Sequence, residues 1–123
     1  SLGKAEAAKL RAGACLTLGR RISNIECGLA LAARSVQAGN ATGRIQGLQV
    51  TSRFSKEVED LMPGSAGEAR AIKAAAEGID RDLRKKKKVS SAESAKILEK
   101  IRMIAKKASG LHDKAVKQCG GGQ

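Results

Sequence analysis

The chain has 123 residues and a net charge of +12, and 41% of its residues are hydrophobic. This length suits one domain, and the hydrophobic content is too high for a disordered chain. With one Phe, no Tyr or Trp and a single Pro, the core must be aliphatic, which favours helices over strands.

Apolar residues spaced alternately by three and four predict the first helix, over about residues 3–37. They are Cys15, Leu18, Ile22, Ile25, Leu29, Ala32 and Val36. Gly13, Gly19 and Gly28 each cost a helix about 1 kcal/mol relative to Ala. We therefore expect either a break near Gly13 or Gly19, or a close approach of a neighbouring helix at these glycines.

Small polar and Gly residues at 38–43 predict a loop, with Thr42 as the N-cap of the second helix. That helix is expected over about residues 44–62, and the pair Pro63-Gly64 ends it. Its apolar stripe consists of Val50, Phe54, Val58 and Leu61, joined by Ile45 and Leu48. We expect this stripe to face the core.

Two capping-box patterns precede the last two helices. Ser65 with Glu68 starts a helix over about residues 66–87, and Ser90 with Glu93 starts one over about residues 91–118. The third helix carries the seam Ala69, Ile72, Ala76, Ile79 and Leu83. The fourth carries Ile97, Ile101, Ile104, Ala108, Leu111 and Ala115.

Four amphipathic helices with short connections predict an all-α fold, a single-domain up-down-up-down four-helix bundle over residues 1–119. Residues 120–123 are expected to form a flexible Gly-rich tail. The apolar run at 27–33 is far shorter than the roughly 20 residues that span a membrane. We expect one core that contains Leu18, Ile22, Ile25, Leu29, Ile72, Ile79, Leu83, Ile101 and Ile104.

A basic run at residues 84–88 is the most conspicuous chemical feature. Continued as a helix and taken with Arg81, it places four cations on one face. On the fourth helix Lys96, Lys100, Lys107 and Lys114 lie close together around the axis, and with the run they could form one continuous positive face. The candidate partner-binding residues are Arg81, Arg84, Lys85, Lys88, Lys96, Lys100 and Lys107. A simpler explanation, which we favour for the run itself, is that cations at a helix C-terminus interact with the helix dipole.

The three cysteines allow two interpretations. In an antiparallel bundle the end of the fourth helix is level with about residues 11–15 of the first, so a Cys15–Cys119 disulfide is geometrically feasible. Cys27 would then be left over. The alternative, which we favour, is a buried Cys15 and free thiols, because free Cys often behaves as a small hydrophobe.

No catalytic, metal-binding or cofactor-binding residue can be assigned. The sequence has no CxxC pair or Cys/His cluster for zinc and no Glu-x-x-His pair for a di-iron site. The single histidine, His112, is expected to be a packing residue at the edge of an apolar face. Glu57, Glu59 and Asp60 are expected to be surface charge.

The charge balance favours an anionic partner. We expect a non-enzymatic protein without a cofactor that binds an acidic partner protein through helix faces. One alternative is a sequence-nonspecific module for the nucleic-acid phosphate backbone, although the chain lacks an aromatic platform for stacking bases. Another is a secreted, disulfide-bearing protein with an apolar ligand, and a third is charge that serves solubility alone. We expect a soluble protein, either cytoplasmic or secreted after removal of a signal peptide.

Overall fold

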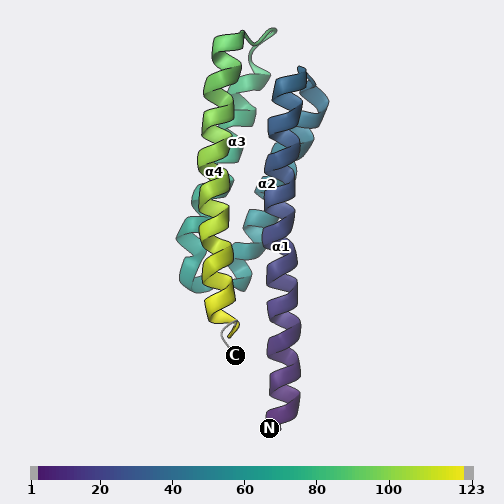
Figure 1. Ribbon diagram of the computed structural model, residues 1–123, viewed down its shortest axis with the longest axis vertical. Helices are drawn as coiled ribbons and strands as arrows, with labels where there is room; N and C mark the ends of the chain where they lie inside the picture. The colour runs from purple at the N-terminus through teal and green to yellow at the C-terminus, as the bar shows by residue number, and fades with distance from the viewer. Residues whose placement is uncertain (1–2, 121–123) are drawn as a thin grey trace.

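The computed structural model describes residues 3–120, which form an all-α four-helix bundle without strands in this range (Figure 1). The elements are α1 (Lys4–Ala38), α2 (Ala41–Leu61), the 3-10 turn η1 (Pro63–Ser65), α3 (Ala66–Arg84) and α4 (Ser91–Gln118). Successive long helices run up, down, up and down (Figure 1), so the predicted fold is confirmed. Residues 121–123 of the expected tail lie outside the described part.

One aliphatic core fills the space between the helices. All nine residues expected there are buried, and Ile22, Ile25 and Ile72 have no exposed surface. The predicted seams of α3 and α4 are buried along their whole length. None of the helices within residues 3–120 combines the length and the hydropathy that a membrane span requires.

The expected core face of α2 is wrong in part, although Leu48 and Val58 are buried as expected. Val50 and Phe54 are only half-buried and Leu61 is exposed. The buried face is instead largely small and polar, and consists of Gly43, Gly47, Leu48, Thr51, Ser55 and Val58. Small side chains are buried on this face because they let the backbones of α1 and α2 approach each other. A search for periodic large apolar residues does not detect such a face.

The buried hydroxyls on that face satisfy their hydrogen bonds within α2. Thr51 Oγ1 donates to the carbonyl oxygen of Gly47 at 2.9 Å, and Ser55 Oγ donates to that of Thr51 at 2.6 Å. Each is thereby buried without losing a partner. Phe54 is partly buried against the core, and the guanidinium carbons of Arg21 and Arg53 are 5.6 and 5.1 Å from its ring centroid.

The glycines of α1 behave differently from one another. The helix continues through Gly13 and Gly19 without a break, and nothing would contact a Cβ at either position within 4 Å. The two expectations for these residues are therefore both wrong. At Gly28 the expected close approach is present, because a Cβ there would lie 2.9 Å from the carbonyl oxygen of Gly47.

Helix ends differ from the predicted ends where a loop residue takes over the cap. Asn40, not Thr42, caps α2, and its Oδ1 accepts a hydrogen bond from Gly43 N at 3.0 Å. Ser65 makes no side-chain cap bond, because it belongs to η1. The capping box of Ser90 and Glu93 at α4 is confirmed.

α3 ends at Arg84, three residues before its predicted end at 87. Leu83 is the last residue that α3 buries in the core, and the lysines at 85–88 are all exposed. Since a further helical turn would bury nothing and would crowd four like charges, the chain leaves the helix at this point. Residues 85–90 instead form a loop that crosses to α4.

Candidate functional site

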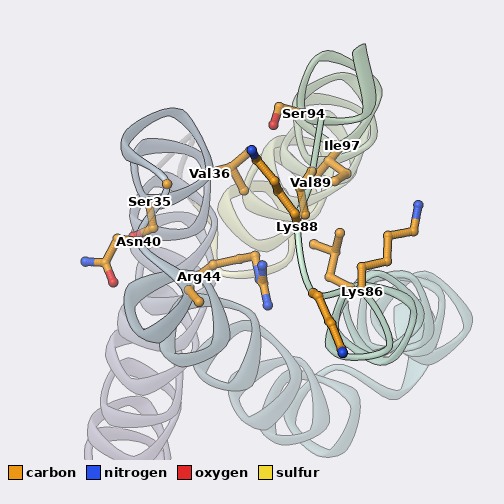
Figure 2. Close-up of a pocket in the computed structure, with 13 residues that line it drawn as sticks. Ser35, Val36, Asn40, Arg44, Lys86, Lys88, Val89, Ser94 and Ile97 are labelled. Carbon is orange, nitrogen blue, oxygen red and sulfur yellow. The ribbon is translucent and has the colours of Figure 1, made fainter. Parts of the chain in front are cut away.

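The two connections α1–α2 and α3–α4 lie at the same end of the bundle (Figure 1). Antiparallel topology requires this, since each connection follows a helix that runs in the same direction. Between them lies a pocket of about 310 Å³ (Figure 2). Its lining combines residues from all four helices and both connections. Among them are Ser35, Val36, Arg44, Leu83, Lys86, Lys87, Lys88, Val89, Ser94 and Ile97.

The lining of this pocket, which we call the end pocket, is cationic. It contains Arg44, Lys86, Lys87 and Lys88, and no Asp or Glu is among its lining residues. Within residues 3–120 the lysines that pair with an acidic group are Lys56, Lys73, Lys86 and Lys114. Lys87 and Lys88 therefore bring uncompensated positive charge to the end pocket, in addition to that of Arg44.

Arg44 is the least solvated cation of the end pocket. It is half-buried, and its Nε is shielded from solvent and has no hydrogen-bond partner within the described residues. A buried donor left unpaired costs about 1–3 kcal/mol, more when the group is charged. Figure 2 shows the side chain extending from α2 towards the loop that carries Lys86 and Lys88. A shift of the side chain towards the end pocket, which Arg44 lines, would bring this donor to an acceptor there.

Local packing fixes where Arg44 starts. Asn40 caps α2, and Gly43 lies against α1 so tightly that a Cβ on it would be 2.3 Å from Ser35 Oγ. The first turn of α2 is thus held on α1, and Arg44 follows directly after the contact. Its side chain extends from this fixed point across the end of the bundle (Figure 2).

The loop at residues 85–90, which we call the lysine loop, is anchored at both ends. Leu83 is buried in the core, and Val89 packs against the core from the other end of the loop. The amide of Lys86 donates to the carbonyl oxygen of Leu83 at 3.1 Å, and the capping box of Ser90 and Glu93 starts α4. The four lysines therefore occupy a short segment with defined ends beside Arg44.

The structure divides the predicted partner-binding residues. Lys88 lines the end pocket, whereas Arg84 forms an ion pair with Asp80 at 3.0 Å. The expected helical face that would join Arg81, Arg84, Lys85 and Lys88 does not form, because α3 ends at Arg84. All seven predicted residues are exposed.

The predicted lysines of α4 lie outside the end pocket. Lys96 and Lys100 line a shallow neighbouring groove of about 150 Å³, which also contains Asp82 and Glu93. Lys86 belongs to both hollows and pairs with Glu93. The groove is therefore less positive than the end pocket, and Lys107 lines neither.

The sequence patterns did not point to Arg44, and they included Lys86 and Lys87 only as members of the basic run, not as candidate partner-binding residues. The available signal was topological. In an up-down-up-down bundle, the residues just after the α1–α2 connection lie beside the α3–α4 connection. Helical periodicity could not show this, because the lysines at 86–88 lie outside any helix.

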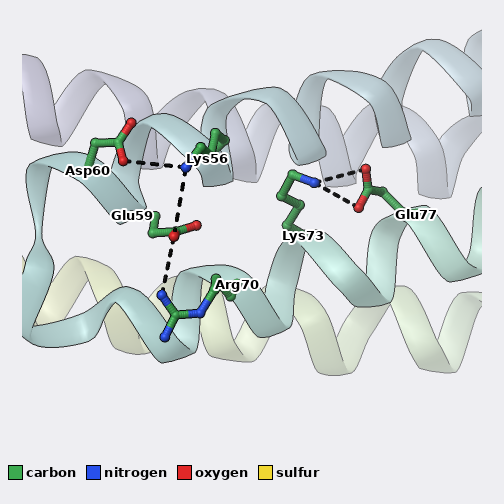
Figure 3. Close-up of polar contacts among 6 residues, drawn as sticks. All are labelled: Lys56, Glu59, Asp60, Arg70, Lys73 and Glu77. Atoms are coloured by element: carbon green, nitrogen blue, oxygen red, sulfur yellow. Dashed lines mark hydrogen bonds and ion pairs between the residues drawn. The ribbon is translucent and has the colours of Figure 1, made fainter.

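The acidic residues of α2 are neutralised by neighbouring cations, in agreement with their assignment as surface charge. Glu59 Oε1 is 3.2 Å from Arg70 Nη1 and 3.8 Å from Lys56 Nζ (Figure 3). The same Lys56 Nζ is 3.6 Å from Asp60 Oδ1. Glu57 pairs with Arg21 at 3.0 Å. This flank of the bundle is therefore an ion-pair network and not an uncompensated charge.

A further pair on the same flank involves Glu77 of α3. Its carboxylate accepts hydrogen bonds from Lys73 Nζ at 2.9 and 3.1 Å (Figure 3), and from Ser52 Oγ at 3.1 Å. The hydrogen bond from Lys73 is the main reason that the pKa of Glu77 is below its ordinary value.

The structure joins Cys15 to Cys119 in a disulfide, with Sγ atoms 2.11 Å apart and Cα atoms 5.8 Å apart. The free-thiol interpretation, which the sequence favoured, is wrong for these two residues, and Cys15 is half-buried, not buried. Cys27 is free and exposed. The bond ties the last residues after α4 to α1, whose earlier turns extend past the bundle (Figure 1).

His112 is half-buried beside α1. Its Nδ1 is 3.7 Å from Glu26 Oε1, too far for a hydrogen bond. Within residues 3–120 no group of three or more His, Cys, Asp or Glu side chains is arranged to hold a metal ion. The end pocket is thus the strongest candidate site in the described part of the chain.

Comparisons of the chain with protein-family models, with curated proteins and with solved structures found no match. The chemistry of the end pocket is therefore the available guide to function. That chemistry consists of positive charge, one shielded donor and an adjoining apolar wall.

Proposed function

We propose that this protein is a non-enzymatic interaction module that binds an acidic segment of a partner protein at the basic end of its bundle. The observation that carries the proposal is the end pocket, whose lining has four cations and no carboxylate. A concave site with one sign of charge concentrates ligands of the opposite sign.

The exposed lysines of α4 support a binding path that continues from the end pocket. Among residues 3–120, Lys96, Lys100 and Lys107 have no acidic group within ion-pair distance. The lysines that do form ion pairs in this range are Lys56, Lys73, Lys86 and Lys114. From Lys96 to Lys107 the helix rises about 16 Å. An extended peptide covers that distance with about five residues, so a short acidic segment could contact both the end pocket and α4.

The geometry supports a protein segment better than a nucleic acid. A duplex presents a broad convex surface with regularly spaced phosphates, and a protein that reads it needs a matching row of cations. The row predicted along α3 is interrupted, because Arg84 pairs with Asp80 and the helix ends there. A nucleic-acid backbone therefore remains the alternative that the experiment below must separate from the proposal.

The disulfide supports the secreted alternative for the compartment. Disulfides persist in oxidising environments and are rare in the cytosol. We therefore propose that the partner is met in an oxidising compartment, a proposal that the redox state of Cys15 and Cys119 in the natural source would test. Binding of an acidic segment is compatible with this compartment.

The test is fluorescence anisotropy with a labelled peptide of about 12 residues, rich in Glu and Asp. We expect binding that weakens as salt is added, because the contacts are ionic. The variant Lys87→Gln/Lys88→Gln should weaken binding about tenfold, which corresponds to about 1.4 kcal/mol. The matched control is Lys4→Gln/Lys9→Gln, which removes the same charge from the exposed far end of α1.

Three results would contradict the proposal. The first is equal weakening by the end-pocket variant and the control, which would show a response to net charge alone. The second is displacement of the peptide by random duplex DNA at lower concentration than by unlabelled peptide, which would favour the nucleic-acid alternative. Retained affinity in both variants would also remove the end pocket from the binding site.

A further inference from the structure

The end pocket has an apolar wall in addition to its cations. The wall consists of Val36, Leu83, Val89 and Ile97. A bare inorganic anion would contact the cations and leave this wall unused. A side chain with a carbon body and an anionic end would contact both.

The shielded donor of Arg44 specifies the shape of the anionic end. A guanidinium presents its N–H groups in a planar fork that binds two oxygens of a carboxylate, phosphate or sulfate at once. Arg44 lines the end pocket, and its Nε is buried and unpartnered within the described residues, so this side of the fork contacts a ligand once the side chain shifts towards the pocket.

The positive charge of the end pocket is larger than one carboxylate can balance. Lys86 is engaged with Glu93, but Lys87 and Lys88 have no such partner among residues 3–120, so together with Arg44 they leave three uncompensated cations. A phosphate ester carries about −1.5 to −2 and three acceptor oxygens. An ester of this kind uses more of the pocket's donors than the carboxylate of Glu or Asp does.

We infer that the end pocket binds a tetrahedral oxyanion ester, phosphate or sulfate, on a side chain of the acidic partner segment. The inference rests on the proposed function, which supplies the segment. The Arg44 fork binds two ester oxygens, while Lys87 and Lys88 balance the charge. The apolar wall contacts the carbon atoms of the modified side chain, and the rest of the segment passes towards Lys96 and Lys100 on α4.

The experiment compares one acidic peptide of about 12 residues in three forms, with a central Tyr that is free, phosphorylated or sulfated. By fluorescence anisotropy the wild-type protein should bind at least one ester about tenfold more tightly than the free form. The ester that binds more tightly identifies the source of the oxyanion. Arg44→Gln should reduce the preference for the ester over the free form to less than about threefold.

Controls separate the guanidinium from its charge. Arg20→Gln removes the same charge from the exposed surface of α1 outside the end pocket and should keep the full preference. Arg44→Lys keeps the charge but lacks the fork, so it should lose most of the preference. Circular dichroism should give the same helix content for all three variants. If Arg44→Gln is not folded, Lys87→Gln/Lys88→Gln provides the second, exposed variant for the same comparison.

The outcomes distinguish this inference from the proposed function. Equal binding of the three peptides by the wild-type protein overturns the ester inference and leaves the proposed function standing. No binding of any form overturns both. A preference that survives in Arg44→Gln and in Lys87→Gln/Lys88→Gln places the ester elsewhere. Binding to vesicles containing phosphatidylinositol 4-phosphate that requires Arg44, without binding of the peptides, would replace the protein partner with a membrane.

Discussion

Gly47 of α2 packs with its backbone directly on the backbone of Ala32 of α1. A Cβ at position 47 would lie 2.6 Å from Ala32 N and 2.6 Å from the carbonyl oxygen of Gly28. Neither neighbour is the end of a flexible side chain, so the two helices would have to separate. The contact explains why the buried face of α2 is built from small residues.

We predict that Gly47→Ala lowers the free energy of unfolding by about 1–3 kcal/mol through overpacking, although Ala is the better helix former. Gly13→Ala is the matched control, because nothing lies within 4 Å of its Cβ position. It should raise stability by about 0.5–1 kcal/mol. Denaturant unfolding followed by circular dichroism measures both changes. If Gly47→Ala is as stable as Gly13→Ala, the helices are not in backbone contact.

The disulfide should stabilise the fold by restricting the unfolded chain. It joins residues 104 positions apart, and removal of such a cross-link typically costs about 2–4 kcal/mol. Reductant or Cys15→Ser/Cys119→Ser should lower the melting temperature, while Cys27→Ser should not. Thiol labelling of the unreduced, denatured protein should find one reactive group, Cys27. Three reactive groups would show that the bond is absent.

Ile101 tests the core of α4. It is 2% exposed, so Ile101→Ala should cost about 2–5 kcal/mol of stability, through lost burial and the cavity left behind. Leu10, which is 61% exposed on the extended part of α1, is the control, and Leu10→Ala should change stability by less than about 0.5 kcal/mol. Chemical denaturation of the two variants compares them. Similar losses of stability in Ile101→Ala and Leu10→Ala would show that the core face of α4 is assigned wrongly.

The ion pair of Lys73 and Glu77 predicts a small pH dependence of stability. The hydrogen bond from Lys73 is the main reason that the pKa of Glu77 is below its ordinary value of 4.5. A carboxylate with a lowered pKa in the folded state contributes stability above the unfolded pKa, and that contribution is lost as the pH falls through the folded pKa. Because Glu77 is exposed, solvent screens the contribution.

NMR titration of the Glu77 side chain measures this effect. In Lys73→Gln the pKa of Glu77 should rise towards its ordinary value, and the part of the acid loss of stability that comes from Glu77 should become smaller. Lys56→Gln, which removes a cation paired with Glu59 and Asp60, should leave Glu77 unchanged. An unchanged pKa of Glu77 in Lys73→Gln would assign the shift to other groups.

Much of the fold was predictable because three helices follow a simple rule. In α1, α3 and α4, aliphatic residues such as Ile22, Ile72 and Ile101 recur with helical spacing, and each is buried as predicted. The capping box of Ser90 and Glu93 was also predictable, since it forms between residues three apart. Local periodicity and local hydrogen bonding are properties of the sequence alone.

The candidate site was predictable only in part. Lys88 was identified and lines the end pocket, whereas Arg44, more than 40 positions earlier in the chain, was not. The end of α3 at Arg84 also escaped prediction, because it depends on where the core stops and not on helix propensity. The pocket exists because topology brings two connections to one end of the bundle.

By itself, therefore, the sequence determined an all-helical chain with three aliphatic seams and a strong positive charge. Only the tertiary structure decided which face of α2 is buried, that Cys15 and Cys119 are joined, and that Arg44 faces the lysine loop. The physical reason is range: helix spacing and caps involve residues within four positions of one another. Backbone contact at Gly47, the disulfide and the end pocket each depend on groups brought together from separate helices.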